Sequence, residues 1–281
     1  MRRDLLGWLR IAVRLPPAVA LLLGGLLTVS IVFPFAAAPR RARIASRWSR
    51  WLLRCCGIRL REVADERLSA GSAAAGSACT PPGCMMVANH VSWLDIFLVQ
   101  ASAPASFVAK AEIRRWPLIG WLVAGAGTLF IERHRRHAIH DVNQHIERAL
   151  REGRRVAVFP EGTTGAGDRL LPFHGNLIEA ALRAGAPIVP VGIRYVDERG
   201  EMPEAVRFIG TTTFVISFFR VLGEPTVIAE THYLGPVSGA TRQAVAAHAR
   251  HAIAERLRLP FDDELPQVVR ALRARGNPAR G

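Results

Sequence analysis

Short apolar runs alternate with amphipathic stretches over most of this chain. The short runs predict strands at Gly57–Val63, Cys84–Ala88, Ser106–Ala109, Thr128–Ile131, Arg155–Phe159, Ile188–Tyr195, Phe214–Phe219 and Glu224–Ile228. Apolar residues at helical spacing predict helices at Ile44–Cys56, His137–Glu152, Leu177–Ala184 and Thr241–Arg258, and one that starts at Trp93. This order predicts an α/β fold, in which a largely parallel central sheet is flanked by helices.

One apolar stretch near the N-terminus is too long for a strand. Residues 15–39, LPPAVALLLGGLLTVSIVFPFAAAP, contain no charged side chain. Because about 20 apolar residues cross the hydrocarbon core of a bilayer, this stretch predicts a membrane anchor. A secretory signal peptide is the alternative, since Arg2 and Arg3 precede the stretch and Ala36–Ala38 are small. The length of the stretch and the arginines that follow it favour the anchor.

Arginines flank the apolar stretch on both sides, at positions 2, 3, 10 and 14 and at positions 40, 41, 43, 47, 50 and 54. The positive-inside tendency therefore places the larger C-terminal part at the cytoplasmic face of the inner membrane. Gly24–Gly25 and Pro34 permit a re-entrant hairpin, and a single transmembrane span is the other possibility. Ile44–Cys56, with tryptophans among arginines, is typical of an amphipathic helix at the membrane interface.

The net charge of +14 indicates which partners the protein binds. A strongly basic protein binds nucleic acid or an anionic membrane surface. The neighbouring apolar anchor favours membrane lipids, and no RNA-binding aromatic motif or zinc-finger spacing is present in the sequence. Nucleic acid is therefore not an expected partner. We divide the chain into an anchor with its interfacial helix (1–56), an α/β domain (57–260) and a polar basic tail (261–281).

A histidine and an aspartate follow the strand predicted at Cys84–Ala88, in the stretch VANHVSWLDIF. On one continuous helix His90 and Asp95 would differ by about 140° and would not meet. They can meet if His90 lies in a turn before a helix and Asp95 lies in its first turn, as the capping-box-like Ser92-x-x-Asp95 indicates. An imidazole oriented by a carboxylate can act as a general base. A purely structural role, with Asp95 capping the helix, is the alternative from spacing alone.

Four blocks in order resemble the 1-acylglycerol-3-phosphate acyltransferase family of glycerolipid acyltransferases. NHVSWLD (Asn89–Asp95) is similar to the NHxxxxD box, GTLFIER (Gly127–Arg133) to the second block, FPEGTT (Phe159–Thr164) to the third and IVPVGI (Ile188–Ile193) to the fourth. The resemblance covers about residues 57–230. It implies a glycerol-phosphate acyltransferase-like fold, with residues 57–260 as the catalytic domain and His90 and Asp95 as the catalytic pair.

The resemblance also implies an acceptor site at the same edge of the sheet. It assigns substrate binding to Lys110, Arg133, Glu161, Gly162 and Thr163, with Arg133 binding a phosphate. From the residues themselves, the glycines after Phe159 allow the backbone to approach a ligand closely. Glu161 is expected to pair with a cation such as Arg133 or to hold an acceptor hydroxyl. The family's third block commonly reads FPEGTR, so Thr164 departs from it and leaves the acceptor head group open.

We therefore expect a membrane-bound acyltransferase that needs no cofactor and no metal. The acyl donor is acyl-CoA or acyl-carrier protein, and the acceptor is a lysophospholipid, most simply 1-acyl-sn-glycerol 3-phosphate, which yields phosphatidic acid. Lyso-ornithine lipid is the alternative acceptor, and a non-catalytic basic protein that binds anionic lipid is the alternative from another class. The histidines at 134, 137, 140 and 145 are interpreted as a solvated basic face, because zinc needs a closed set of about four ligands.

Overall fold

The computed structural model describes residues 5–65, 80–116, 119–125, 127–131 and 138–260. A single sheet of seven strands lies at its centre in the order β1-β7-β6-β2-β5-β3-β4. The strands are β1 (Ile58–Ala64), β2 (Met85–Ala88), β3 (Ser106–Lys110), β4 (Leu129–Ile131), β5 (Val156–Val158), β6 (Ile188–Val196) and β7 (Val227–Tyr233). All neighbouring strands are parallel except β6 and β7. The predicted α/β fold with a largely parallel sheet is confirmed.

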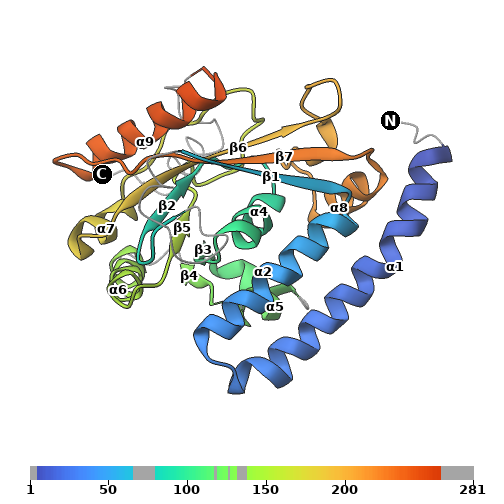
Figure 1. Cartoon of the computed structure of the whole chain (residues 1–281), viewed down its shortest axis with the longest axis horizontal. Coiled ribbons are helices and arrows are strands. Elements are labelled where there is room, and N and C mark those ends of the chain that lie inside the picture. The colour runs from blue at the N-terminus through green and yellow to red at the C-terminus, as the bar shows by residue number, and fades with distance from the viewer. Residues whose placement is uncertain (1–4, 66–79, 117–118, 126, 132–137, 261–281) are drawn as a thin grey trace, which may run out of the picture.

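Helices cover both faces of this sheet (Figure 1). The helices are α1 (Leu5–Leu27), α2 (Ala38–Cys55), α4 (Leu94–Ser102), α5 (Ile119–Gly125), α6 (Ala138–Arg151), α7 (Ile178–Ala184), α8 (Phe214–Gly223) and α9 (Arg242–Leu257). Short helical turns η1 (Thr28–Val32), η2 (Phe33–Phe35), η3 (Ala111–Arg115) and η4 (Glu204–Val206) join them.

Alternate residues of the central strand β2 build the two hydrophobic cores. Met86 and Ala88 belong to the core with α2, α4 and α8, whereas Met85 and Val87 belong to the core with α6, α7 and α9. All four side chains are at most 1% exposed. A strand that is buried on both faces reads as a continuous apolar run, which is why the sequence pattern predicted β2 correctly.

The N-terminal helices α1 and α2 run side by side in opposite directions (Figure 1). The chain reverses at η2, and the indole Nε1 of Trp48 donates a hydrogen bond to the carbonyl of Leu21, 2.9 Å away. Near the middle of α1, Arg14 donates to the carbonyls of Leu222 (3.1 Å) and Glu224 (2.7 Å) at the end of α8. The two helices therefore form a hairpin, in which α1 packs against α8 and α2 packs against α4.

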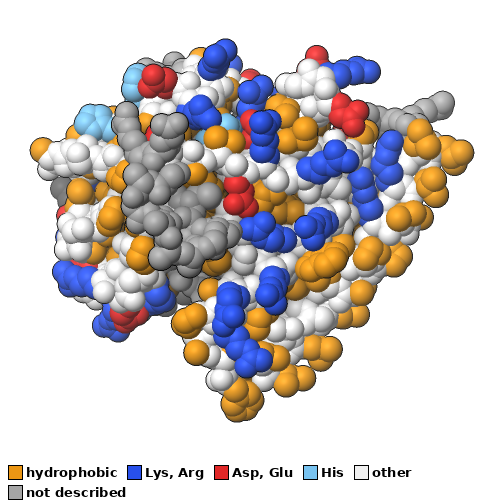
Figure 2. Space-filling model, in the orientation of Figure 1, with side chains coloured by type: hydrophobic (Ala, Val, Ile, Leu, Met, Phe, Trp, Pro, Cys, Tyr) orange, Lys and Arg blue, Asp and Glu red, His pale blue; other side chains and the backbone are white. Residues whose placement is uncertain are grey.

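The hairpin exposes an unusually apolar surface. Leu5–Phe35 is, within the described residues, the one helical stretch long and apolar enough to cross a membrane, and only 17% of its most apolar window is buried. Leu9, Val13, Leu27 and Phe35 are between 59% and 89% exposed. Figure 2 shows hydrophobic side chains along the edge of the molecule that α1 forms, with Lys and Arg side chains gathered over the adjacent α2. Such a continuous apolar face on a protein surface marks a site of interaction.

One predicted strand was wrong. Phe214–Phe219 forms the first part of helix α8, and the strand predicted at Glu224–Ile228 is β7, which begins three residues later, at Val227, and extends to Tyr233. A short run of β-branched and aromatic residues does not distinguish a buried strand from a helix. The side chain of Thr213 accepts a hydrogen bond from the backbone N of Ile216 and so caps the helix at its start.

Candidate active site

The turn after β2 is held in place by an asparagine. Asn89 follows the last residue of β2, and its side chain donates to the carbonyl of Ile193 (3.0 Å) and accepts from the backbone N of Ile193 (2.7 Å). These two side-chain bonds hold the chain to β6 just beyond Ala88 and Val191, the last pair in register between β2 and β6. The chain therefore leaves the sheet at a fixed angle, with His90 as the next residue.

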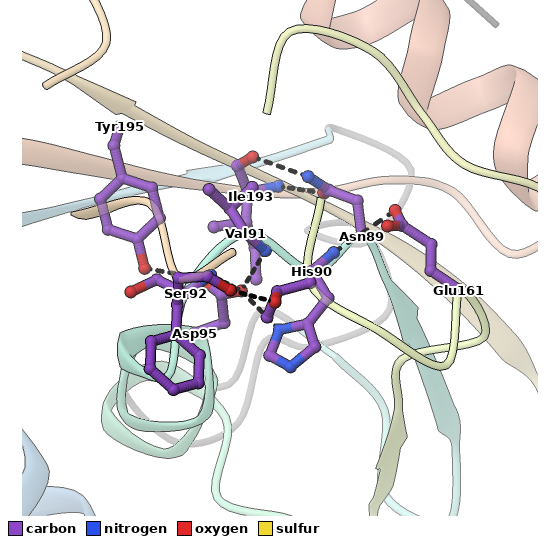
Figure 3. A network of polar contacts seen from close by, with 10 residues as sticks. Asn89, His90, Val91, Ser92, Asp95, Glu161, Ile193 and Tyr195 are labelled. Carbon is purple, nitrogen blue, oxygen red and sulfur yellow. Dashed lines mark hydrogen bonds and ion pairs between the residues drawn. The ribbon is translucent and has the colours of Figure 1, made fainter. Parts of the chain in front are cut away.

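His90 and Asp95 meet as predicted (Figure 3). The Nδ1 atom of His90 lies 2.7 Å from Oδ2 of Asp95, which is in the first turn of α4. The same Oδ2 accepts from the backbone N of Val91 (2.7 Å) and of Ser92 (2.9 Å). The bond from Ser92 has the direction of the returning bond of a capping box, but α4 has no side-chain cap bond in the forward direction, so only half of the predicted capping box is formed.

The two side chains differ in their exposure to solvent. The Asp95 side chain is fully buried, whereas that of His90 is 18% exposed. The imidazole stacks on the ring of Phe159, with 4.1 Å between centroids and 15° between planes. Since Nδ1 faces a carboxylate, it carries the ring proton, and Nε2 is the basic nitrogen. The ring is thus held on two sides and presents one nitrogen for proton transfer.

Tyr195 is a member of the site that the sequence did not indicate. Its hydroxyl donates to Oδ1 of Asp95 at 2.5 Å, and its side chain is fully buried. Burial, together with the charge of Asp95, raises the pKa of Tyr195 well above its ordinary value. The pattern Ile188–Tyr195 predicted the strand, but nothing in a strand pattern identifies the partner of an inward-facing phenol.

The loop after β5 lies directly against the histidine. The backbone N of Gly165 donates to the carbonyl of His90 at 2.7 Å, and Oε1 of Glu161 lies 3.4 Å from the backbone N of His90. Glu161 is only 3% exposed, and burial, with a further contribution from the charge of Asp95, raises its pKa well above the usual range. Gly162 has φ of +71°, a left-handed conformation that favours glycine.

Of the remaining predicted site residues, the structure describes the backbone of Lys110 and Thr163 but not Arg133. Lys110 ends β3, and in register it pairs with Ile131, the last residue of β4. Because the carboxyl ends of parallel strands meet at one edge of a sheet, β2, β5, β3 and β4 all lead to the edge that carries His90. Thr163 lies in the loop after β5. Arg133 lies outside the described residues, so its predicted pairing with Glu161 stays a prediction.

Thr164 stands where the family's third block commonly has arginine. Its hydroxyl donates to the carbonyl of Phe208, and the backbone N of Phe208 donates to the carbonyl of Val91 at 3.2 Å. Thr164 therefore ties the loop after β5 to the segment after β6, next to the turn that carries His90. It supplies no positive charge to the site.

Comparisons with known proteins agree with this geometry. A family model described as Acyltransferase matches residues 75–194. The lyso-ornithine lipid O-acyltransferase of Pseudomonas aeruginosa is 40% identical over 218 residues, which are 76% of this chain and 78% of that protein. The chain belongs to the 1-acylglycerol-3-phosphate acyltransferase family.

Two further relatives of this acyltransferase family are informative. The 1-acyl-sn-glycerol-3-phosphate acyltransferase of Neisseria gonorrhoeae is 46% identical over 121 residues, which are 43% of this chain and 48% of that protein. The crystal structure of the 1-acyl-sn-glycerophosphate acyltransferase of Thermotoga maritima covers 90% of this chain and 100% of its own, with a TM-score of 0.58 and 18% identity, and therefore shows a shared fold.

Membership of this family makes the protein an acyltransferase and excludes the non-catalytic alternative. Within the described residues, no group of three or more His, Cys, Asp or Glu side chains could hold a metal ion. His140 and His145 are exposed and contact Gln144 and the carbonyl of Asp141, while the other two histidines of that segment lie outside the described residues. The interpretation of this segment as a solvated face stays a prediction.

Proposed function

We propose that this acyltransferase transfers a fatty acyl group from acyl-CoA or acyl-carrier protein to the hydroxyl of a lysophospholipid, with 1-acyl-sn-glycerol 3-phosphate as acceptor and phosphatidic acid as product. The contact that carries the proposal is the 2.7 Å distance between Nδ1 of His90 and Oδ2 of Asp95. An imidazole so oriented accepts a proton through Nε2.

In the proposed reaction, the acceptor hydroxyl gives its proton to Nε2 of His90 as its oxygen attacks the thioester carbonyl. The new C–O bond forms, the C–S bond breaks, and the thiolate leaves with the proton from the imidazolium. Asp95 keeps the imidazole in the tautomer with Nδ1 protonated and stabilises the positive ring. No nucleophilic side chain is needed, because the thioester supplies the leaving group and the substrate supplies the nucleophile.

The acceptor head group is proposed to bind at the edge where β2, β5, β3 and β4 end. Lys110 and Arg133 provide positive charge for a phosphate, and Gly162 and Thr163 provide backbone and hydroxyl donors. Glu161 is compatible with a phosphate because its raised pKa favours the neutral carboxyl, which repels an anion less than a carboxylate would.

Lyso-ornithine lipid is the second candidate acceptor. Two observations favour it: the 40% identity with a lyso-ornithine lipid O-acyltransferase extends over 76% of this chain, and Thr164 replaces an arginine that would contact a phosphate. The acyl transfer itself would be the same, because only the head group of the acceptor differs.

We further propose that the α1–α2 hairpin anchors the enzyme at the cytoplasmic face of the inner membrane. The hairpin and its turns form the anchor (1–56), residues 57–260 form the catalytic domain, and the tail (261–281) lies outside the described residues. The exposed apolar side chains of α1 and the arginines of α2 support this arrangement, since apolar side chains enter the bilayer while arginines contact anionic head groups.

The experiment that tests the function presents the purified full-length enzyme with one acyl-CoA and either lysophosphatidate or lyso-ornithine lipid. Mass spectrometry of the lipid product identifies the acceptor used. Phosphatidic acid as the faster product supports the main proposal, and acylated ornithine lipid supports the second. Release of free CoA without acylation of either lipid would contradict both. Repeating the assay with acyl-carrier protein thioester identifies the donor.

A further inference from the structure

Tyr195 reaches the catalytic pair from the opposite side to His90 (Figure 3). It lies on β6, the strand that pairs with β2, whereas Asp95 lies in the first turn of α4, so the contact joins the sheet to this helix. Its ring is fully buried, and its hydroxyl lies 2.5 Å from Oδ1 of Asp95. The proposed mechanism uses Asp95 and His90 but assigns no role to this phenol.

The hydrogen bonds to Asp95 divide between its two oxygens. Oδ2 accepts from Nδ1 of His90 and from the backbone N atoms of Val91 and Ser92. Oδ1 accepts from Tyr195, and among the described residues this is the one donor to that oxygen. A fully buried carboxylate depends strongly on such donors, because burial removes the water that would otherwise solvate its charge.

The phenol remains a donor throughout the working range of the enzyme. Burial and the neighbouring Asp95 charge raise the pKa of Tyr195 well above its ordinary value, so the proton stays on the phenol oxygen. The bond therefore has one direction, from Tyr195 to Asp95, and it removes part of the negative charge from the carboxylate that faces the imidazole.

We propose that Tyr195 is a positioning residue for acyl transfer, whose hydroxyl fixes Oδ1 of Asp95 so that Oδ2 is directed at Nδ1 of His90. This inference rests on the proposed role of His90 as general base. Tyr195 does not contact the substrate or the reacting atoms; it acts through Asp95. Without its hydroxyl the carboxylate has more rotational freedom and a higher charge density, and the imidazole is oriented less well.

The chain provides a matched control, since it contains only two tyrosines. Tyr233 is also fully buried, and it lies on β7, the neighbour of β6 on the side away from β2. Tyr195→Phe and Tyr233→Phe each remove one buried hydroxyl from the same sheet. Only the first removes a donor to Asp95, so a general effect of losing a buried hydroxyl appears in both variants and a positioning effect appears in one.

We expect Tyr195→Phe to lower kcat about tenfold with little change in the KM for the acceptor, since a hydrogen bond to a charged group has about this effect. The acid-side midpoint of the pH profile of kcat/KM should rise, because a carboxylate that no longer shares its charge with a phenol stabilises a positive imidazolium more. In an Asp95→Asn background, Tyr195→Phe should cause no further loss of kcat.

A second measurement does not depend on the stability of Tyr195→Phe. In the Tyr233→Phe variant, 3-fluorotyrosine occupies position 195 alone, and its ¹⁹F resonance reports the phenol environment. The resonance should shift with pH at the same midpoint as the acid side of kcat/KM, and the shift should disappear in the same protein carrying His90→Ala.

The possible outcomes separate this inference from the proposed function. Equal kcat values and pH profiles for Tyr195→Phe and Tyr233→Phe would overturn the inference while His90→Ala still abolishes turnover. A ¹⁹F resonance that is constant across the pH profile of an active protein would overturn it as well. Full turnover by folded His90→Ala would instead remove the proposed mechanism, whatever the two tyrosine variants show.

Discussion

Replacing Asn89 should weaken both the fold and the reaction. In Asn89→Ala, the backbone N and carbonyl of Ile193 lose their two partners, at 2.7 and 3.0 Å, in a region where Ile193 is 1% exposed. Each unpaired buried group costs about 1–3 kcal/mol, so we expect the free energy of unfolding to fall by about 3 kcal/mol. For a domain of this size, this lowers Tm by roughly 6–10 °C.

The effect on activity follows from the place of Asn89 in the chain. His90 is the next residue, and loss of the bridge to β6 allows the catalytic turn to move. Because a displacement of about 1 Å at a reacting group can cost a factor of about 100, we expect kcat to fall at least tenfold at temperatures where the variant is folded. Thermal unfolding in detergent and release of CoA from acyl-CoA measure the two effects separately.

Two further variants make the test specific. Asn89→Asp keeps the acceptor, but at neutral pH it places a buried charge beside the carbonyl of Ile193, so its Tm should fall relative to that of Asn89→Ala as pH rises and the carboxyl ionises. Asn143→Ala is the matched control, because Asn143 is also buried and makes one side-chain bond, to the carbonyl of Asn176 at 2.9 Å, far from the catalytic turn. If Asn89→Ala and Asn143→Ala lowered Tm equally and left kcat unchanged, the reasoning would be refuted.

Three other predictions concern the N-terminal hairpin and the loop after β5. Arg14→Ala removes two hydrogen bonds to carbonyls at the end of α8 (2.7 and 3.1 Å) and should lower the free energy of unfolding by about 2 kcal/mol. Arg10→Ala removes one bond of 3.3 Å and should lower it less. Chemical denaturation measures both losses, and equal losses would contradict the role given to Arg14. Gly167→Ala should lower the free energy of unfolding by about 1–2 kcal/mol, because φ at this position is +81° and the added Cβ would lie 2.4 Å from Cε of Met202. An unchanged denaturation midpoint would show that alanine is accommodated there without strain. Burial raises the pKa of Glu161 well above its ordinary value, so the folded protein loses stability as pH rises from the ordinary pKa of a glutamate carboxyl to the raised folded-state pKa. Glu161→Gln cannot ionise, so its Tm should gain on that of the wild type as pH rises above the ordinary glutamate range. A Tm difference independent of pH would contradict this.

The contact between His90 and Asp95 could be predicted because its geometry is local. A turn before a helix and a capping-box spacing place His90 near Asp95 with no information from the rest of the chain. The strands β2 and β6 were predictable for a similar reason, since continuous apolar runs bounded by turn residues are typical of strands buried on both faces. These features depend on neighbours within a few residues.

Features that depend on distant contacts were not predictable. α8 reads as a strand because FVISFF is apolar, β-branched and aromatic, but in the fold Trp93 donates from Nε1 to the hydroxyl of Ser217 at 3.0 Å, and arginines of α1 bond the carbonyls at its end. Tyr195 contacts a carboxylate 100 positions away in sequence. Both interactions follow from the tertiary fold alone.

The central claim is that Nε2 of His90 removes the proton from the acceptor hydroxyl. The most direct measurement is the steady-state release of CoA by folded, full-length His90→Ala at saturating acyl-CoA and acceptor, compared with the wild type. We expect a kcat lower by a factor of about 10²–10⁴ with the thermal unfolding of the protein preserved. Turnover equal to that of the wild type would contradict it.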